Sequence, residues 1–96
     1  MLSLQAIKEI VVPLAKKYDL ERIFLFGSYA RGEATDKSDI DFRIDKGSMK
    51  GLQFCGFYTD MEDALRIPID ILTTQQLPRK FLKSISNEEI LLYERK

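Results

Sequence analysis

The sequence contains no histidine and only one cysteine among its 96 residues. Without histidine, Ser-His-Asp and Cys-His catalysis and any His-ligated zinc site are excluded. The single Cys55 cannot form a disulfide within the chain, and its apolar neighbours favour a small core residue over a nucleophile. Carboxylate and metal chemistry is therefore the only type of catalysis for which this sequence supplies the residues.

The sequence also has no excess of either charge and no long apolar run. Lys plus Arg and Asp plus Glu number 15 each, so no global field attracts a polyanion, and nucleic acid is not expected as a partner. No apolar run approaches the ~20 residues of a membrane span, and Lys8 and Glu9 interrupt the first apolar stretch, unlike a signal peptide. We expect a cytoplasmic protein with one domain over residues 1–96.

A short apolar run at residues 23–26 ends at Gly27, which is typical of a strand buried on both faces that stops where the chain turns. Ser28 follows, and residues 29–32 can form a single helical turn. A strand that ends in Gly-Ser and opens a helix presents backbone N–H groups and a hydroxyl to a phosphate. The sequence therefore predicts phosphate contacts at Gly27 and Ser28.

The strongest chemical signal is a pair of aspartates on the next expected strand. Ile40, Phe42 and Ile44 alternate with acidic and basic residues, the period of a half-buried strand. If they face the core, Asp39 and Asp41 project together from the other face. Two carboxylates about 4 Å apart repel by about 4 kcal/mol at an effective dielectric of about 20, which favours a bound cation. Oxygen ligands of this kind suit Mg²⁺.

The rest of the chain supplies supporting helices and strands. The expected elements are a helix over residues 3–18 with Ser3 as N-cap and Pro13 inside it, a core-packed helix over 52–65, a strand over 67–72 and a helix over 75–85. Residues 45–51 are expected to form a mobile, solvated linker, and residues 90–93 fit either a helix or a short edge strand. These elements predict an α/β fold, a small mixed sheet with helices packed against it.

The spacing of these motifs resembles that of a known enzyme superfamily. Gly27-Ser28, ten intervening residues and then Asp39-Ile40-Asp41 resemble the Gly-Ser…Asp-x-Asp signature of the nucleotidyltransferases related to DNA polymerase beta. The fuller strings at residues 26–35 and 38–41 are similar to the small prokaryotic branch, the minimal nucleotidyltransferases (MNT). Members of that branch are usually encoded beside a HEPN-domain toxin and act as its antitoxin.

The resemblance implies a nucleotidyltransferase fold and Mg²⁺-dependent transfer of AMP from ATP to a hydroxyl. Asp39 and Asp41 would hold Mg²⁺ on the triphosphate. Asp70 is a charge in an otherwise hydrophobic strand and occupies the place of the third carboxylate of the family. It would act as metal ligand, general base or both. The alternative is an aspartate with a purely structural role. Arg31 is a possible cationic assistant to Gly27 and Ser28 at the phosphates.

The implied partner is a HEPN ribonuclease toxin, modified on a tyrosine and held in a hetero-oligomer. We expect no room for an acceptor domain in 96 residues, so a partner or a second copy would supply the acceptor site. Residues 90–93 or the face around Phe57 and Tyr58 could supply the apolar contact. Two alternatives stay open: a small-molecule adenylyltransferase of the aminoglycoside-modifying type, and a non-catalytic antitoxin that blocks its toxin by binding.

Overall fold

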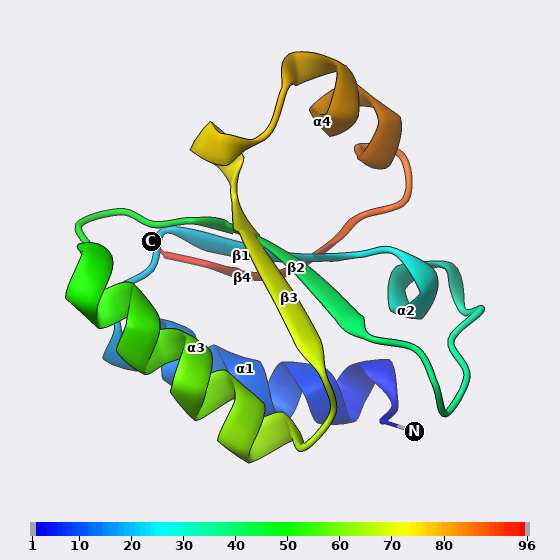
Figure 1. Cartoon of the computed structure of the whole chain (residues 1–96), viewed down its shortest axis with the longest axis horizontal. Coiled ribbons are helices and arrows are strands. Elements are labelled where there is room, and N and C mark those ends of the chain that lie inside the picture. The colour runs from blue at the N-terminus through cyan, green and yellow to red at the C-terminus, as the bar shows by residue number, and fades with distance from the viewer. Residues whose placement is uncertain (1, 96) are drawn as a thin grey trace.

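Four strands form one mixed sheet in the computed structural model, which describes residues 2–95 (Figure 1). The elements in chain order are α1 (Leu4–Lys17), β1 (Arg22–Phe26), α2 (Ser28–Arg31), β2 (Ile40–Asp45), α3 (Gly51–Leu65), β3 (Ile69–Thr73), the 3₁₀ turn η1 (Thr74–Gln76), α4 (Arg79–Ile85) and β4 (Ile90–Glu94). The predicted α/β fold class is confirmed.

The strand order is β3-β2-β1-β4, so β1 and β2 are the central strands. Strand β1 is antiparallel to both β2 and β4, whereas β2 and β3 are parallel and are joined by the crossover helix α3. A parallel pair needs such a long connection because the chain must return to the starting edge of the sheet. The start of β2, the start of β3 and the end of β1 therefore lie next to one another at one end of the strands. This end of the sheet is the edge on which the site described below is built.

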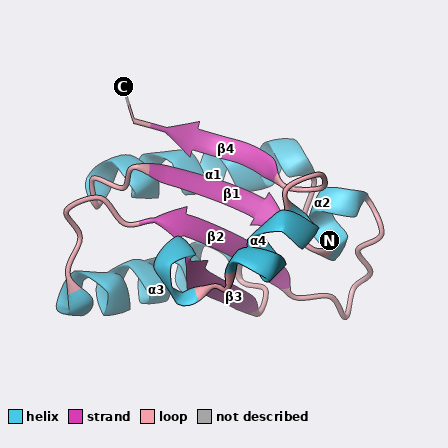
Figure 2. Ribbon diagram, turned by 90° about the horizontal axis from the view of Figure 1, so that it is seen from above, coloured by secondary structure: helices cyan, strands magenta, loops and turns pink. Residues whose placement is uncertain are grey.

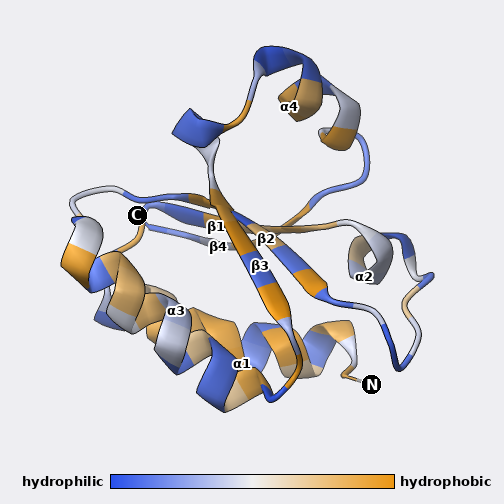
Figure 3. Cartoon of the chain, in the orientation of Figure 1, coloured by the Kyte–Doolittle hydropathy of each residue, from blue (hydrophilic) through white to orange (hydrophobic). Residues whose placement is uncertain are grey.

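The hydrophobic core lies between the sheet and helices α1 and α3, which cover the same face (Figure 1). Ile40, Phe42 and Ile44 of β2 are fully buried, as their alternation predicted. Each helix contributes buried residues at four-residue spacing: Ile7, Val11 and Ala15 from α1, and Phe57, Met61 and Leu65 from α3. Figure 3 shows hydrophobic and hydrophilic residues alternating at the start of β3.

The opposite face of the sheet is covered in part by α4, which lies across from α1 and α3 (Figures 1 and 2). Phe81 of α4 meets Phe26 edge-on, with ring centroids 6.0 Å apart. Phe24 is only half-buried, so the prediction that residues 23–26 are buried on both faces holds for part of the strand. Among residues 2–95, no helix is long and apolar enough to cross a membrane.

The predicted N-cap of α1 is present. Ser3 caps α1 by accepting a hydrogen bond from the Ala6 N–H at 3.1 Å, and α1 runs on through the exposed Pro13. Residues 90–93 belong to the edge strand β4, which completes the sheet along β1. The linker at 45–51, which was predicted to be solvated, is solvated only in part, because its Met49 is buried in the core.

The prediction that Cys55 is a core residue is wrong: its side chain is exposed. Apolar neighbours in sequence do not share its position on the helix, because successive residues of a helix point in directions about 100° apart. Phe57, by contrast, is fully buried and so cannot belong to an apolar contact surface.

Candidate active site

Asp41 and Asp70 are register partners in the parallel pair of strands β2 and β3. Partners on neighbouring strands project from the same face of the sheet. Asp39 precedes β2 by one residue. The three aspartates singled out in the sequence are therefore grouped around the starting edge of β2 and β3.

The turn after β1 meets this acidic group directly. Phe26 is the register partner of Asp41 across β1 and β2, so Gly27 follows at the same edge. Gly27 has φ 76° and ψ −155°, a conformation open almost only to glycine. A Cβ at Gly27 would overlap Asp41 Oδ2 and lie 3.2 Å from Asp41 Cγ. Glycine is thus required both by the backbone and by the close approach of the carboxylate.

Ser28 begins helix α2 beside these carboxylates and is half-buried. Its hydroxyl makes no hydrogen bond with another of residues 2–95, while its carbonyl accepts from the Glu33 N–H at 2.9 Å. Gly32 ends the helix in the left-handed conformation with φ 73°. Within the described residues, the turn therefore presents a hydroxyl without a hydrogen-bond partner close to Asp41.

Asp41 lies in an unfavourable electrostatic environment for a carboxylate. Burial raises the pKa of Asp41 above its usual 3.8, and the charges of Asp70 and Asp39 raise that pKa further. Arg31 opposes the shift and lowers the pKa of Asp41. Asp39 and Asp70 are exposed. A bound cation would relieve this repulsion, since it favours the ionised form of Asp41.

Within residues 2–95, no group of three His, Cys, Asp or Glu side chains is close enough together to enclose a metal ion. The donor chemistry nevertheless fits Mg²⁺, which uses one or two carboxylates and completes its shell with water and substrate phosphate. Asp39 and Asp41 fit such an open site, whose other ligands would arrive with the nucleotide.

Arg31 lies near the acidic group but is already engaged. Its Nε donates to Glu33 Oε1 at 2.7 Å and its Nη1 donates to Glu88 Oε1 at 3.2 Å. Its effect on the pKa of Asp41 places its charge within electrostatic reach of that carboxylate. The sequence did not indicate Glu88, which lies between α4 and β4 and carries no motif.

Tyr58 is a second residue that the sequence analysis did not place at the site. Its hydroxyl donates to the Ile69 carbonyl at 2.8 Å, directly before Asp70. Burial raises the pKa of Tyr58, and the charges of Asp70, Glu62 and Asp39 add to that shift. Tyr58 thus ties α3 to the strand that carries the third carboxylate.

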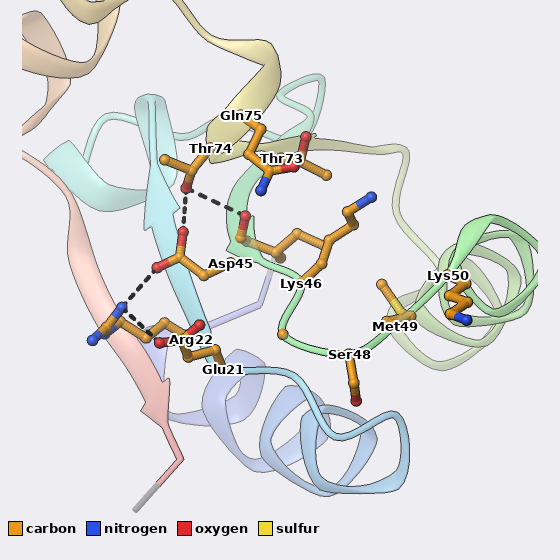
Figure 4. A pocket seen from close by; sticks show the side chains of 12 residues that line it. Glu21, Arg22, Asp45, Lys46, Ser48, Met49, Lys50, Thr73, Thr74 and Gln75 are labelled. Atoms are coloured by element: carbon orange, nitrogen blue, oxygen red, sulfur yellow. Dashed lines mark hydrogen bonds and ion pairs between the residues drawn. The ribbon is translucent and has the colours of Figure 1, made fainter.

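A well-formed cavity lies elsewhere, at the opposite end of β2 (Figure 4). It has a volume of about 700 Å³ and includes Lys46, Lys50 and Gln75 in its lining. Asp45, also in the lining, accepts from Thr74 and pairs with Arg22 at 3.1 Å. None of the six predicted site residues lines this cavity, so it does not coincide with the candidate active site.

Residues 7–96 match the protein family described as polymerase beta, nucleotidyltransferase. The chain therefore belongs to this family, and the class of enzyme that its fold and acidic edge define is a nucleotidyltransferase. Its relatives indicate the minimal branch. A proposed protein adenylyltransferase of Methanocaldococcus jannaschii is 37% identical over 98 residues, covering 97% of this chain and 99% of the relative. The protein adenylyltransferase MntA of Thermococcus cleftensis is 28% identical and covers 94% of this chain and 96% of its own length.

Solved structures agree with this assignment. A proposed minimal nucleotidyltransferase superposes with a TM-score of 0.79 at 28% identity, over 91% of this chain and 90% of that chain. A structure of a tri-AMPylated Shewanella oneidensis HEPN toxin in complex with an MNT antitoxin contains a chain with a TM-score of 0.70. That chain is 17% identical and the match covers 95% of this chain and 72% of that one, which establishes a shared fold.

Proposed function

We propose that this chain is a Mg²⁺-dependent adenylyltransferase that transfers AMP from ATP to a tyrosine hydroxyl of a cognate HEPN-domain toxin and thereby acts as its antitoxin. The observation that carries the proposal is the grouping of Asp41, its partner Asp70 and the Gly27 turn at one sheet edge. The proposal is supported by relatives named as protein adenylyltransferases and by a neighbouring structure that contains an AMPylated HEPN toxin.

Asp39 and Asp41 would hold the cation, since they lie two residues apart at the start of β2 and the charge of Asp39 already disfavours the ionised form of Asp41. When bound, Mg²⁺ would neutralise the developing charge on the attacking and leaving oxygens. Ser28 would donate its free hydroxyl to an outer phosphate, and Gly27 would let the backbone approach that phosphate closely. Arg31 would add a charged donor at the same place.

Asp70 would act on the acceptor, because it is exposed and lies on the outer strand β3. The acceptor oxygen would form a bond to the α-phosphorus while the bond to pyrophosphate breaks, and Asp70 would receive the hydroxyl proton. A phenol suits this role because its pKa of about 10 makes it easier to deprotonate than an aliphatic alcohol.

An apolar groove beside α2 supports a protein as the acceptor. The groove has a volume of about 320 Å³, and its lining comprises Leu2, Leu4, Tyr29, Ala30, Gly32, Ala34 and Ile90. Leu91 of the edge strand is also exposed. Protein interfaces are centred on apolar contacts of this kind, whereas a polycationic antibiotic needs a wide anionic pocket. A hetero-oligomer with the toxin would cover this groove.

The test is to incubate the purified protein with the product of the adjacent gene, ATP and Mg²⁺, and to map added AMP by peptide mass spectrometry. We expect AMP on a tyrosine of the partner, and no transfer when Asp41→Asn replaces the wild type. Modification of serine or threonine would correct the residue type. A modified small molecule with an unmodified protein would overturn the proposal in favour of an antibiotic-type enzyme, and inhibition of the toxin without any transfer would favour a binding antitoxin.

A further inference from the structure

Glu88 joins the candidate active site to a distant part of the chain. It lies in the connection between α4 and β4, which passes beside α2 (Figure 2), and accepts a hydrogen bond from Arg31 Nη1 at 3.2 Å. The two residues are 57 positions apart in sequence. A guanidinium has five N–H donors, so the contacts of Arg31 with Glu33 and Glu88 leave others free for a second anion.

The backbone at Glu88 is held by hydrogen bonds to the end of α4 and by the side chain of the adjacent Glu89. The N–H groups of Glu88 and Glu89 both donate to the Ile85 carbonyl, at 3.0 and 2.9 Å. The adjacent Glu89, whose side chain is 13% exposed, accepts two hydrogen bonds from Arg43, at 2.7 and 3.0 Å.

Arg43 itself belongs to β2, two residues after Asp41. Its guanidinium lies 4.0 Å from the centroid of the Phe24 ring and also donates to Thr74 Oγ1 at 2.7 Å. A bidentate ion pair with so little exposure fixes both partners far better than a surface pair does. The Arg43–Glu89 pair therefore anchors the α4–β4 connection on the same strand that carries Asp41.

We propose that Glu88 is a positioning residue that fixes the Arg31 guanidinium toward the triphosphate site. Arg31 stands on a helix of four residues, and its side chain is 43% exposed. Its other partner, Glu33, lies only two residues away and has a side chain that is 61% exposed, so without Glu88 the guanidinium would sample more rotamers and each binding event would have to order it again. Glu88 removes that cost in advance. This inference rests on the proposed use of a nucleoside triphosphate at the acidic edge.

The experiment compares Mg·ATP binding by isothermal titration calorimetry in the wild type, Glu88→Ala, Glu88→Gln, Arg31→Ala and the Arg31→Ala/Glu88→Ala double variant. We expect Glu88→Ala to raise the dissociation constant about two- to tenfold, as for one side chain that must be ordered on binding. Glu88→Gln should stay close to the wild type, because its amide oxygen can accept the same hydrogen bond from Arg31.

The double variant separates positioning from a structural role. If Glu88 acts through Arg31, removing Glu88 after Arg31 should change the dissociation constant no further. Glu94→Ala is the matched control, since Glu94 pairs with an arginine, Arg22, at the far end of β4 and its side chain is 52% exposed. It should leave Mg·ATP binding unchanged, and thermal unfolding should show the Glu88 and Glu94 variants folded.

Unchanged Mg·ATP binding by Glu88→Ala would overturn the inference. Tighter binding would also overturn it, because Glu88 would then compete with the phosphates for Arg31. So would an equal effect of Glu88→Ala with and without Arg31. A wild type that binds Mg·ATP but transfers no AMP would overturn the proposed function while the binding comparison still decides the role of Glu88. A wild type that binds no nucleotide would overturn both.

Discussion

Asp41 of β2 and Asp70 of β3 are partners in a parallel strand pair, so two carboxylates project side by side from adjacent strands. The pair lies next to Gly27, whose missing side chain leaves the space that Asp41 occupies. The resulting repulsion raises the pKa of Asp41 together with its burial. A site that repels its own charges when empty is suited to a cation.

Asp41→Asn should reduce AMP transfer by about a hundredfold or more, because it removes a candidate ligand of the catalytic cation. The free energy of unfolding should be unchanged or higher, since a repelled and partly buried charge is lost. Transfer is followed by mass spectrometry and stability by urea denaturation. Asp60→Asn is the control: Asp60 pairs with Lys17 and Tyr18 away from the site and should keep full transfer. Full activity of Asp41→Asn would contradict the assignment.

Gly27→Ala should abolish most transfer and destabilise the fold by about 1–3 kcal/mol, because an alanine is strained in this backbone conformation and its Cβ would displace Asp41. Gly32→Ala is a matched control. Gly32 has a similar φ of 73°, but nothing lies within 4 Å of its added Cβ. It should lose about 1–2 kcal/mol from backbone strain and retain binding of Mg·ATP, which is compared in both variants because Gly32 also lines the apolar groove proposed for the toxin. Equal loss of Mg·ATP binding in both variants would indicate that strain, and not displacement of Asp41, is responsible.

As the pH is lowered, cation binding should begin to weaken at a higher pH than it would at a site built from an aspartate of ordinary pKa. Because the pKa of Asp41 is raised above 3.8, its proton competes with the cation from a higher pH onward. In the cation-free protein the same shift means that protonation favours the folded state, so the contribution of Asp41 to stability increases as the pH falls through its raised pKa. Carboxyl NMR titration measures this pKa directly. Asp70→Asn should lower it by removing the larger of the two neighbouring charge effects, and no change would contradict the described grouping.

Arg43→Leu should destabilise the protein by about 3–5 kcal/mol, because it leaves the nearly buried Glu89 without its partner. Arg22→Leu is the comparison. Arg22 also pairs with carboxylates, but its side chain is 38% exposed, and surface pairs contribute about 0–1 kcal/mol. Adding Glu89→Gln to Arg43→Leu should recover part of the loss. Urea denaturation measures all three variants, and equal losses for the two arginines would show that the Arg43 pair has no special weight.

Much of the site could be predicted because its signals are local. The alternation of Ile40, Phe42 and Ile44 fixes which face of β2 is buried, since side chains of a strand alternate whatever the rest of the fold does. The Gly27-Ser28 turn follows from the end of an apolar strand and the conformational freedom of glycine. The α/β class and the acidic pair were therefore determined by the sequence itself.

Contacts between distant segments had no such signal. Neither Glu88 nor Glu89 carries a pattern, and their partners Arg31 and Arg43 lie 57 and 46 residues away. Residues 90–93 became a strand because β1 had an open edge to pair with, and Cys55 became exposed because its helix turned it outward. Only the tertiary structure decided these placements. Packing and charge pairing depend on which segments meet in space, and the strand order and connections of the whole sheet determine that.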